Sequence, residues 1–279
     1  MNPVRNLISN GADVRYVDAH CHIQFDDYGA DRAAIIEHMK AAGIVGIVVG
    51  VDRASSRGAV ALAEQHEHLF ASVGLHPNGA DEGFDAAAYQ ALAEHPKVVA
   101  VGECGLDYFR PAEVNEEVKR VQKELLQKHI ALAALVGKPL IVHARPSKGT
   151  EDAYRDLIDL LREAKAAYPK LSGDVHFFVG SSAAAEELRT LGFAVSFTAV
   201  ITFAHDYDAV IRSMPLSGML SETDAPYVAP AVRRGKRNDP LAVIDVVAKI
   251  AEIRDEDPEA VRTALLANAL RLFPLPGLG

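Results

Sequence analysis

The chain has no tryptophan, only two cysteines and no long hydrophobic run. Aromatic residues make up 6% of its 279 positions, so the composition offers no aromatic-rich platform for stacking nucleic acid bases. Two cysteines cannot build a disulfide framework, which makes a reducing compartment the expected location. No apolar stretch approaches the roughly 18 residues that a membrane-spanning helix needs. These absences favour a cytoplasmic protein with no membrane partner.

The charge balance disfavours one further class of protein, the nonspecific nucleic-acid binders. A formal net charge of −9 argues against a broad, nonspecific nucleic-acid surface but permits a local basic patch. The shares of hydrophobic residues (49%) and charged residues (24%) are typical of a globular domain. The sequence contains no internal repeat and no low-complexity linker. We therefore expect a flexible leader over residues 1–13, without an export signal, followed by one domain over 14–279.

Short runs rich in Val, Ile and Phe alternate with longer amphipathic stretches along the whole chain. Because most of these runs are continuously apolar, they resemble parallel strands buried on both faces. The predicted strands are 15–22, 44–51, 69–75, 97–103, 138–144, 173–179, 193–200 and 217–223. The predicted helices are 31–42, 53–68, 84–95, 113–136, 151–167, 182–191, 206–213, 239–252 and 258–271.

This alternation predicts an α/β fold, a (β/α)8 TIM barrel in a single domain with an extra C-terminal helix. A doubly wound open sheet is the alternative. That fold is disfavoured because the segment 23–27, Ile-Gln-Phe-Asp-Asp, follows the first strand where a glycine-rich phosphate loop would be needed.

In such a barrel the chemistry lies at the C-terminal ends of the strands. His20 and His22 end the first strand and share a face because strand side chains alternate. Among eleven histidines such a pair carries little weight alone. Five other strand ends, however, carry residues of the same chemical kind: His76, Glu103, Asp107, His143, Arg145, His176, Glu222 and Asp224. The histidines in predicted helices or at their ends are expected to be exposed or partly packed: His38, His66, His68, His95 and His129.

Six of the strand-end residues have the composition of a two-metal site: His20, His22, Glu103, His143, His176 and Asp224. Imidazoles and carboxylates suit Zn²⁺ or Mn²⁺, and carboxylate-rich positions also accept Mg²⁺. Six ligands are too many for one tetrahedral ion with an open position, whereas two ions sharing a carboxylate would use them all. Asp224 would then orient a metal-activated water and accept its proton.

Seven segments, in order along the chain, resemble the motifs of the TatD-related metal-dependent deoxyribonucleases of the amidohydrolase superfamily. The segments are 20–22, 74–77, 102–107, 141–145, 176–178, 222–226 and 234–238, and the resemblance spans roughly residues 16 to 273. It implies a (β/α)8 barrel that binds two divalent metal ions and hydrolyses DNA at strand ends or on single strands.

The resemblance also implies a role for each matched residue. His20 and His22, with Asp224, would bind the first metal. His143 and His176 would bind the second, and Glu103 would bridge the two as a second catalytic carboxylate. His76 and Asp107 would contact substrate phosphate, while Arg145 and Glu222 would contact the substrate or support the ligands.

The segment 232–238 is the strongest basic cluster of this acidic chain, and it follows the eighth strand. Its position predicts that Arg234 and Lys236 contact a phosphate backbone at the mouth of the site. Cys21 and Cys104 alternate with the proposed ligands, so they should be buried against the helices and should not bind metal.

Two other functions remain open on sequence grounds. The same metal-bound hydroxide could hydrolyse another ester or an amide, such as the ester of an aminoacyl-tRNA. The third possible function is that of a non-catalytic metal-binding protein, because a fold alone does not imply an activity.

Overall fold

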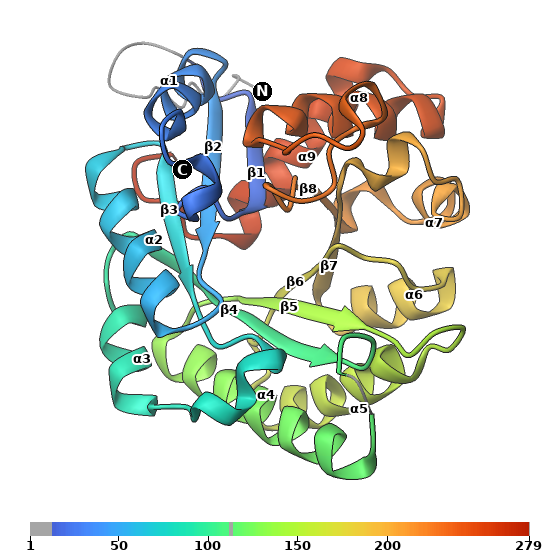
Figure 1. The fold of residues 1–279 in the computed structure, drawn as a ribbon. Helices are drawn as coiled ribbons and strands as arrows, with labels where there is room; N and C mark the ends of the chain where they lie inside the picture. The colour runs from blue at the N-terminus through green and yellow to red at the C-terminus, as the bar shows by residue number, and fades with distance from the viewer. Residues whose placement is uncertain (1–12, 112–113, 279) are drawn as a thin grey trace.

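Eight parallel strands in sequential order form the centre of the molecule, which we describe from a computed structural model covering residues 13–111 and 114–278 (Figure 1). The strands are β1 (Tyr16–Cys21), β2 (Ile44–Val49), β3 (Leu69–Val73), β4 (Val98–Asp107), β5 (Leu140–Arg145), β6 (Gly173–His176), β7 (Phe193–Phe197) and β8 (Met219–Ser221). The predicted (β/α)8 barrel is confirmed. Apart from Asp13, the leader predicted over residues 1–13 lies outside the described residues.

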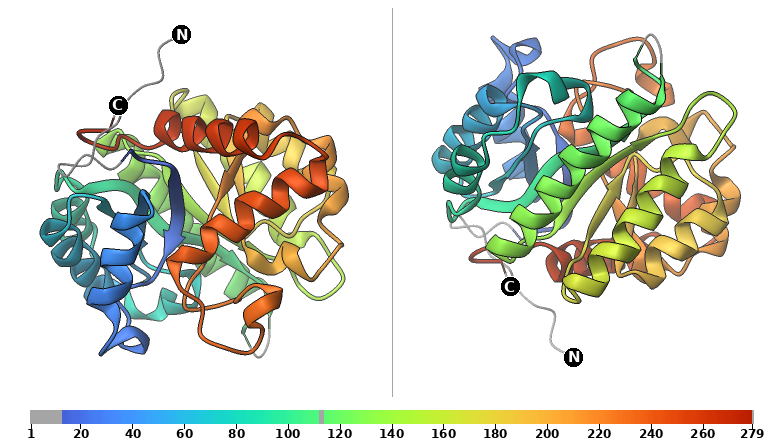
Figure 2. Two further views of the ribbon diagram at one scale, coloured as in Figure 1. Left: turned by 90° about the horizontal axis from the view of Figure 1, so that it is seen from above. Right: turned by 90° about the horizontal axis from the view of Figure 1, so that it is seen from below.

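Helices surround the strands on the outside (Figure 2). They are α1 (Arg32–Ala41), α2 (Arg53–Gln65), α3 (Ala86–Ala93), α4 (Glu116–Val136), α5 (Asp152–Ala167), α6 (Ser182–Thr190), α7 (Asp208–Ser213), α8 (Val243–Arg254) and α9 (Pro258–Leu272). Six short 3₁₀ helices are described: η1 (Asp26–Tyr28), η2 (Pro77–Glu82), η3 (Ala199–Thr202), η4 (Leu216–Gly218), η5 (Ala231–Arg233) and η6 (Pro240–Ala242). Within the described ranges, no helix is both long and apolar enough to cross a membrane.

Local sequence explains where several helices begin and end. Asp52 caps α2 by accepting a hydrogen bond from the Ser55 backbone N–H at 2.6 Å, and the Ser55 hydroxyl accepts from the Asp52 N–H in return. Asn115 caps α4 in the same way through the Val118 N–H. Gly43, with a φ of 68°, follows α1 in the left-handed conformation that ends many helices. These signals place the loops that carry the site.

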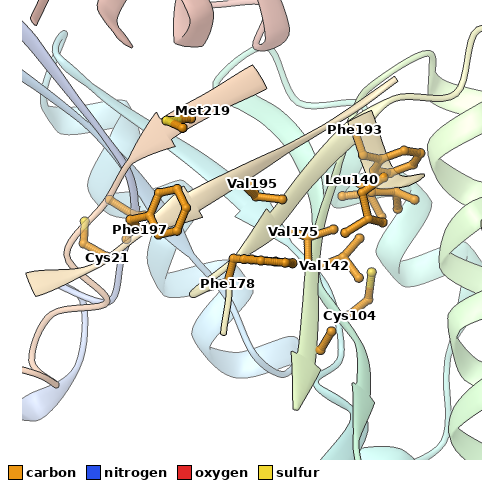
Figure 3. Close-up of a cluster of buried hydrophobic side chains, with 14 of the residues drawn as sticks. Cys21, Cys104, Leu140, Val142, Val175, Phe178, Phe193, Val195, Phe197 and Met219 are labelled. Carbon is orange, nitrogen blue, oxygen red and sulfur yellow. The ribbon is translucent and has the colours of Figure 1, made fainter. Parts of the chain in front are cut away.

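The main hydrophobic core lies between the strands and the surrounding helices. Along β5, Leu140 and Val142 pack into this core, whereas His143 and Arg145 alternate with them and face the inside of the barrel. Figure 3 shows Leu140 and Val142 in this cluster together with both cysteines. Cys21 and Cys104 are buried and unbridged, as predicted.

A second, smaller core fills the barrel at the N-terminal ends of the strands. Inward-facing residues of β2 such as Val45 and Ile47 belong to it, and so do Phe273, Leu275 and Leu278, which follow α9. The chain after the extra helix therefore covers one end of the barrel. The polar residues gather at the other end, where the strands finish.

The barrel closes through the segment after β8. A strand-like bridge between Cys21 and Ala225 joins β1 to the segment that follows β8. The His22 N–H donates to the Ala225 carbonyl at 2.7 Å, and the Asp224 N–H donates to the His20 carbonyl at 2.9 Å. Closure of the barrel therefore also brings Asp224 beside His20 and His22.

Two histidines outside the site correct the sequence prediction. His68 and His129 are buried, although both were expected to be exposed or partly packed. His129 donates through Nδ1 to the Leu125 carbonyl at 2.9 Å and accepts the Leu75 N–H through Nε2 at 3.0 Å. Burial lowers the pKa of each imidazole to about 4. His38 is exposed, and His66 and His95 are partly buried, as predicted.

Candidate metal centre

Glu103, on β4, lies between two groups of possible metal ligands. Its Oε2 is 3.5 Å from His20 Nε2 and 3.9 Å from His22 Nε2. Its Oε1 is 3.1 Å from His143 Nδ1 and 2.9 Å from His176 Nε2. The two oxygens of one carboxylate thus face two different pairs of imidazoles, which is the arrangement that a bridging ligand requires.

The first ligand group combines His20, His22 and Asp224. The two Nε2 atoms are 3.1 Å apart, and Asp224 Oδ1 lies 3.8 Å and 3.5 Å from them. His22 Nδ1 is 2.8 Å from the Val49 carbonyl, so it must carry the proton that it donates there. The lone pair of His22 is consequently on Nε2, the atom that faces Glu103 and Asp224.

The second ligand group contains His143 and His176, whose Nδ1 and Nε2 atoms are 3.2 Å apart. His143 presents its other nitrogen, Nε2, to Asp107 Oδ2 at 3.3 Å. A carboxylate behind a ligating imidazole fixes the ring and increases its basicity. Asp107 therefore supports the second group from the β4 side.

Glu222 stands behind both groups. Its oxygens lie 3.8 Å from His20 Nδ1 and 3.7 Å from His176 Nδ1, and these two rings stack with centroids 3.9 Å apart. The Phe177 N–H donates to Glu222 Oε1 at 2.6 Å and holds the carboxylate in place. Protons on the two Nδ1 atoms facing Glu222 leave both Nε2 atoms free for metal.

These residues fit divalent metal ions. Zinc–nitrogen bonds of about 2.0–2.1 Å in a tetrahedron separate two ligand nitrogens by about 3.3 Å. The nitrogen pairs here, at 3.1 Å and 3.2 Å, are close to that spacing. The Nδ1 atoms of His20 and His176 face Glu222 instead, behind the site, and form no hydrogen bond within the described residues. All six predicted ligands are at most 9% exposed.

The carboxylates are ionised despite their burial. Burial alone would raise the pKa of Glu103, but the surrounding His176, His76 and His143 hold it well below its usual range. For Asp224, burial is likewise outweighed by the neighbouring imidazoles of His22, His20 and His176, which lower its pKa. Negative charge is therefore maintained where a cation would bind.

The predicted substrate residues on the β3 and β4 side lie beside the centre. His76 Nε2 is 3.4 Å from Glu103 Oε1, which makes His76 a neighbour of the second ligand group. Asp107 Oδ1 accepts the backbone N–H groups of Phe109 and Arg110, each at 2.9 Å. Asp107 is thus both a loop cap and a partner of His143, and its contacts are with protein groups.

A cavity of about 640 Å³ opens above the ligands. Arg145 lines it, with its guanidinium 4.1 Å from the centre of the Phe109 ring. Sequence reasoning missed several other lining residues: Phe25, Asn78, Arg110, Phe177, Tyr207 and Tyr227. The aromatic residues among them come from different loops, so composition alone underestimated the aromatic surface. The rule that strand ends carry the site would have found Arg110 and Tyr227, which follow the motifs of β4 and β8.

The basic segment 232–238 makes several contacts within the protein, and its contact with a phosphate backbone stays a prediction. Arg233 pairs with Asp239 at 2.6 Å, and Arg237 pairs with Asp31. The Arg234 guanidinium lies 3.5 Å from the centre of the Phe203 ring, and Lys236 is exposed. The described residues that line the cavity include neither Arg234 nor Lys236.

A (β/α)8 barrel that gathers four imidazoles and two carboxylates at its strand ends defines the class of metal-dependent hydrolases. A family model described as TatD related DNase matches residues 17–274. The chain therefore belongs to the TatD family.

Individual relatives agree with this assignment. The uncharacterized metal-dependent hydrolase YabD of Bacillus subtilis strain 168 is 36% identical over 261 residues, which cover 92% of this chain and 98% of YabD. The uncharacterized metal-dependent hydrolase TatD of Mycobacterium tuberculosis H37Rv is 35% identical over 269 residues, which cover 93% of this chain and 98% of that protein. The crystal structure of the TatD homologue YjjV from Escherichia coli K12 matches with a TM-score of 0.84 at 31% sequence identity. The match covers 94% of this chain and 99% of the YjjV chain.

Proposed function

We propose that this protein is a metal-dependent phosphodiesterase that hydrolyses DNA, acting on strand ends or single strands in the cytoplasm. The observation that carries the proposal is the placement of Glu103 between two ligand groups beneath a cavity with Arg110 and Arg145 on its wall. Two divalent ions suit in-line displacement at phosphorus, and arginines suit the charge of the phosphate. The imidazole-rich ligand set favours Zn²⁺ or Mn²⁺ over Mg²⁺.

The chain's own residues have separate tasks in this proposal. Bound divalent ions supply a hydroxide near neutral pH and neutralise charge on the phosphodiester. Asp224 belongs to the first ligand group and is an ionised carboxylate beside His22, so it can orient the attacking water and accept its proton. Glu222 keeps the imidazoles of His20 and His176 turned toward the centre. His76 lines the cavity beside Glu103 and would contact a phosphate oxygen.

Hydrolysis of another ester or an amide, including an aminoacyl-tRNA ester, is the alternative activity. It would use the same ligands and the same carboxylate base. The two cavity arginines favour a phosphate-bearing substrate over a neutral one. A purely structural metal site is disfavoured because an open cavity lies directly over the ligands.

A reconstitution assay tests the proposal. Protein stripped with EDTA and reloaded with Zn²⁺, Mn²⁺ or Mg²⁺ is given end-labelled single-stranded DNA, duplex DNA, RNA, aminoacyl-tRNA and small esters. We expect metal-dependent cleavage of DNA and a loss of about 10²- to 10⁴-fold in kcat for Asp224→Asn, the range associated with removing a general base. Asp245→Asn, the same change at an exposed position of α8, should retain activity. Full activity of Asp224→Asn, or preferential cleavage of the acyl esters, would refute the proposal.

A further inference from the structure

A shallow groove adjoins the cavity on its β4 side. It is formed by η2, the segment after β4 and the start of α4, and its volume is about 520 Å³. Asn78 and Arg110 line both the groove and the cavity. These two residues therefore form a ridge over which any chain extending from the metal centre into the groove must pass.

Asp107 fixes this ridge relative to the metal centre. The buried Asp107 carboxylate accepts the Arg110 backbone N–H at 2.9 Å and the Asn78 side-chain amide at 3.0 Å. Its Oδ2 lies 3.7 Å from Arg110 Nε and also 3.3 Å from His143 Nε2. A substrate group bound on the ridge is thereby held at a defined position beside His143 and the other residues of the second ligand group.

Arg110 is the available cation on this ridge. Its side chain is 54% exposed, and its contact with Asp107 is made through Nε. No hydrogen bond of the terminal guanidinium nitrogens is found within the described residues. Arg145, by contrast, lies over Phe109, and Arg233 and Arg237 are paired with carboxylates. As far as the described residues go, the outer edge of the Arg110 guanidinium is thus open to two oxygens of one phosphate.

The groove beyond the ridge has an apolar floor. Five of its residues are Pro77, Ala80, Pro111, Val118 and Val121. Glu117 at its edge is paired with Arg120 at 2.6 Å, while Asp81 remains as an acidic group at the margin. The apolar residues suit the sugar and base of a nucleotide. The acidic Asp81 disfavours a second phosphate at the margin, away from Arg110.

We propose that Arg110 binds the phosphate next to the scissile one, and that the groove accommodates the sugar and base of that flanking nucleotide. The inference rests on the proposed phosphodiesterase function and specifies which substrates it favours. The enzyme distinguishes a trinucleotide, which carries a flanking phosphate, from substrates that have only the scissile phosphate. Arg110 contributes binding to the longer substrate and little to the chemical step.

The test compares Arg110→Ala and Arg110→Lys with the metal-loaded wild type. The substrates are bis(p-nitrophenyl) phosphate, a single-stranded dinucleotide, a trinucleotide, and a trinucleotide with a neutral methylphosphonate at the flanking position. We expect Arg110→Ala to lower kcat/KM on the trinucleotide by about 10- to 100-fold, mainly through KM. On the two substrates without a flanking phosphate the loss should be much smaller, and Arg110→Lys should restore part of the loss on the trinucleotide. Arg57→Ala, at an exposed position of α2, is the matched control.

The methylphosphonate substrate separates a phosphate contact from a general effect. The wild type should lose as much activity on it as Arg110→Ala loses on the natural trinucleotide, and Arg110→Ala should lose nothing more. Binding of a fluorescent trinucleotide to EDTA-treated protein, measured by anisotropy, should weaken by a similar factor in Arg110→Ala. Equal losses on all substrates, or a methylphosphonate effect that persists in Arg110→Ala, would overturn the assignment of Arg110. A wild-type enzyme that hydrolyses none of the phosphodiesters would instead overturn the proposed function, and the inference with it.

Discussion

Replacing Glu103 with Gln should remove most of the stabilisation that bound metal gives this protein. The two carboxylate oxygens face different imidazole pairs, at distances between 2.9 and 3.9 Å. Glutamine keeps the size of the side chain but offers one neutral oxygen and one N–H₂ group, which cannot bind a cation. From this single substitution one metal position therefore loses its ligand, and the other keeps only a neutral oxygen in place of a carboxylate oxygen.

The size of the effect follows from linkage. With metal at about 100 times its Kd, each occupied site stabilises the folded state by about 2.7 kcal/mol, or about 5 kcal/mol for two sites. If each affinity falls about 100-fold, the remaining contribution is about 0.4 kcal/mol per site, so about 4 to 5 kcal/mol is lost. An unfolding entropy of about 2.1 cal/mol/K per residue, over 279 residues, converts this loss to about 8 °C in Tm.

Calorimetry provides the assay. Wild type and Glu103→Gln are each unfolded with EDTA and with saturating Zn²⁺ or Mn²⁺, and the metal content of the loaded samples is measured. The rise in Tm on adding metal should largely disappear in the variant. Glu163→Gln, the same change at an exposed position of α5, should keep the full rise. A Glu103→Gln protein that retains the wild-type rise in Tm and two bound ions would refute the bridging role.

Two further predictions concern histidines and their partners. Burial lowers the pKa of His129 to about 4 from the ordinary histidine value of about 6.5. Its neutral form therefore stabilises the fold above pH 6.5, and this contribution, about 3 kcal/mol, is lost as the pH falls from 6.5 to 4. Urea unfolding in EDTA should therefore give a flatter pH dependence for His129→Gln over that window, and parallel curves for the two proteins would contradict this origin. Glu222→Gln should lower metal affinity about 10- to 100-fold, because the neutral amide no longer fixes the Nδ1 protons of His20 and His176. Competition with a chromophoric chelator measures this affinity, and an unchanged value would show that the two rings are oriented by other groups.

Much of the fold was predictable because its signal is local. Continuous apolar runs mark strands buried on both faces, and every predicted run overlaps a strand of the barrel. The six proposed ligands were also recognisable, since barrels place chemistry at strand ends, and the structure brings all six together.

Alternation within a strand, however, explains only part of the site. It accounts for His143 and Arg145 on the regular strand β5. The register shifts along β1 between Asp18 and Cys21 and along β4 between Val101 and Cys104. Asp224 lies beyond the end of β8 with a φ of 52°, so a turn directs it toward His22. Such irregularities depend on neighbouring strands and leave no periodic signal in the sequence.

By itself, the sequence determined the order of strands and helices, the candidate metal ligands and the burial of the two cysteines, because each depends on residue type and short-range spacing. Only the tertiary structure decided which charges remain available to a substrate. Arg237, within the basic segment, is paired with the distant Asp31, whereas Arg110 extends from a short loop onto the ridge beside the metal centre. Pairing between residues far apart in the chain depends on how the barrel closes, and no local pattern records it.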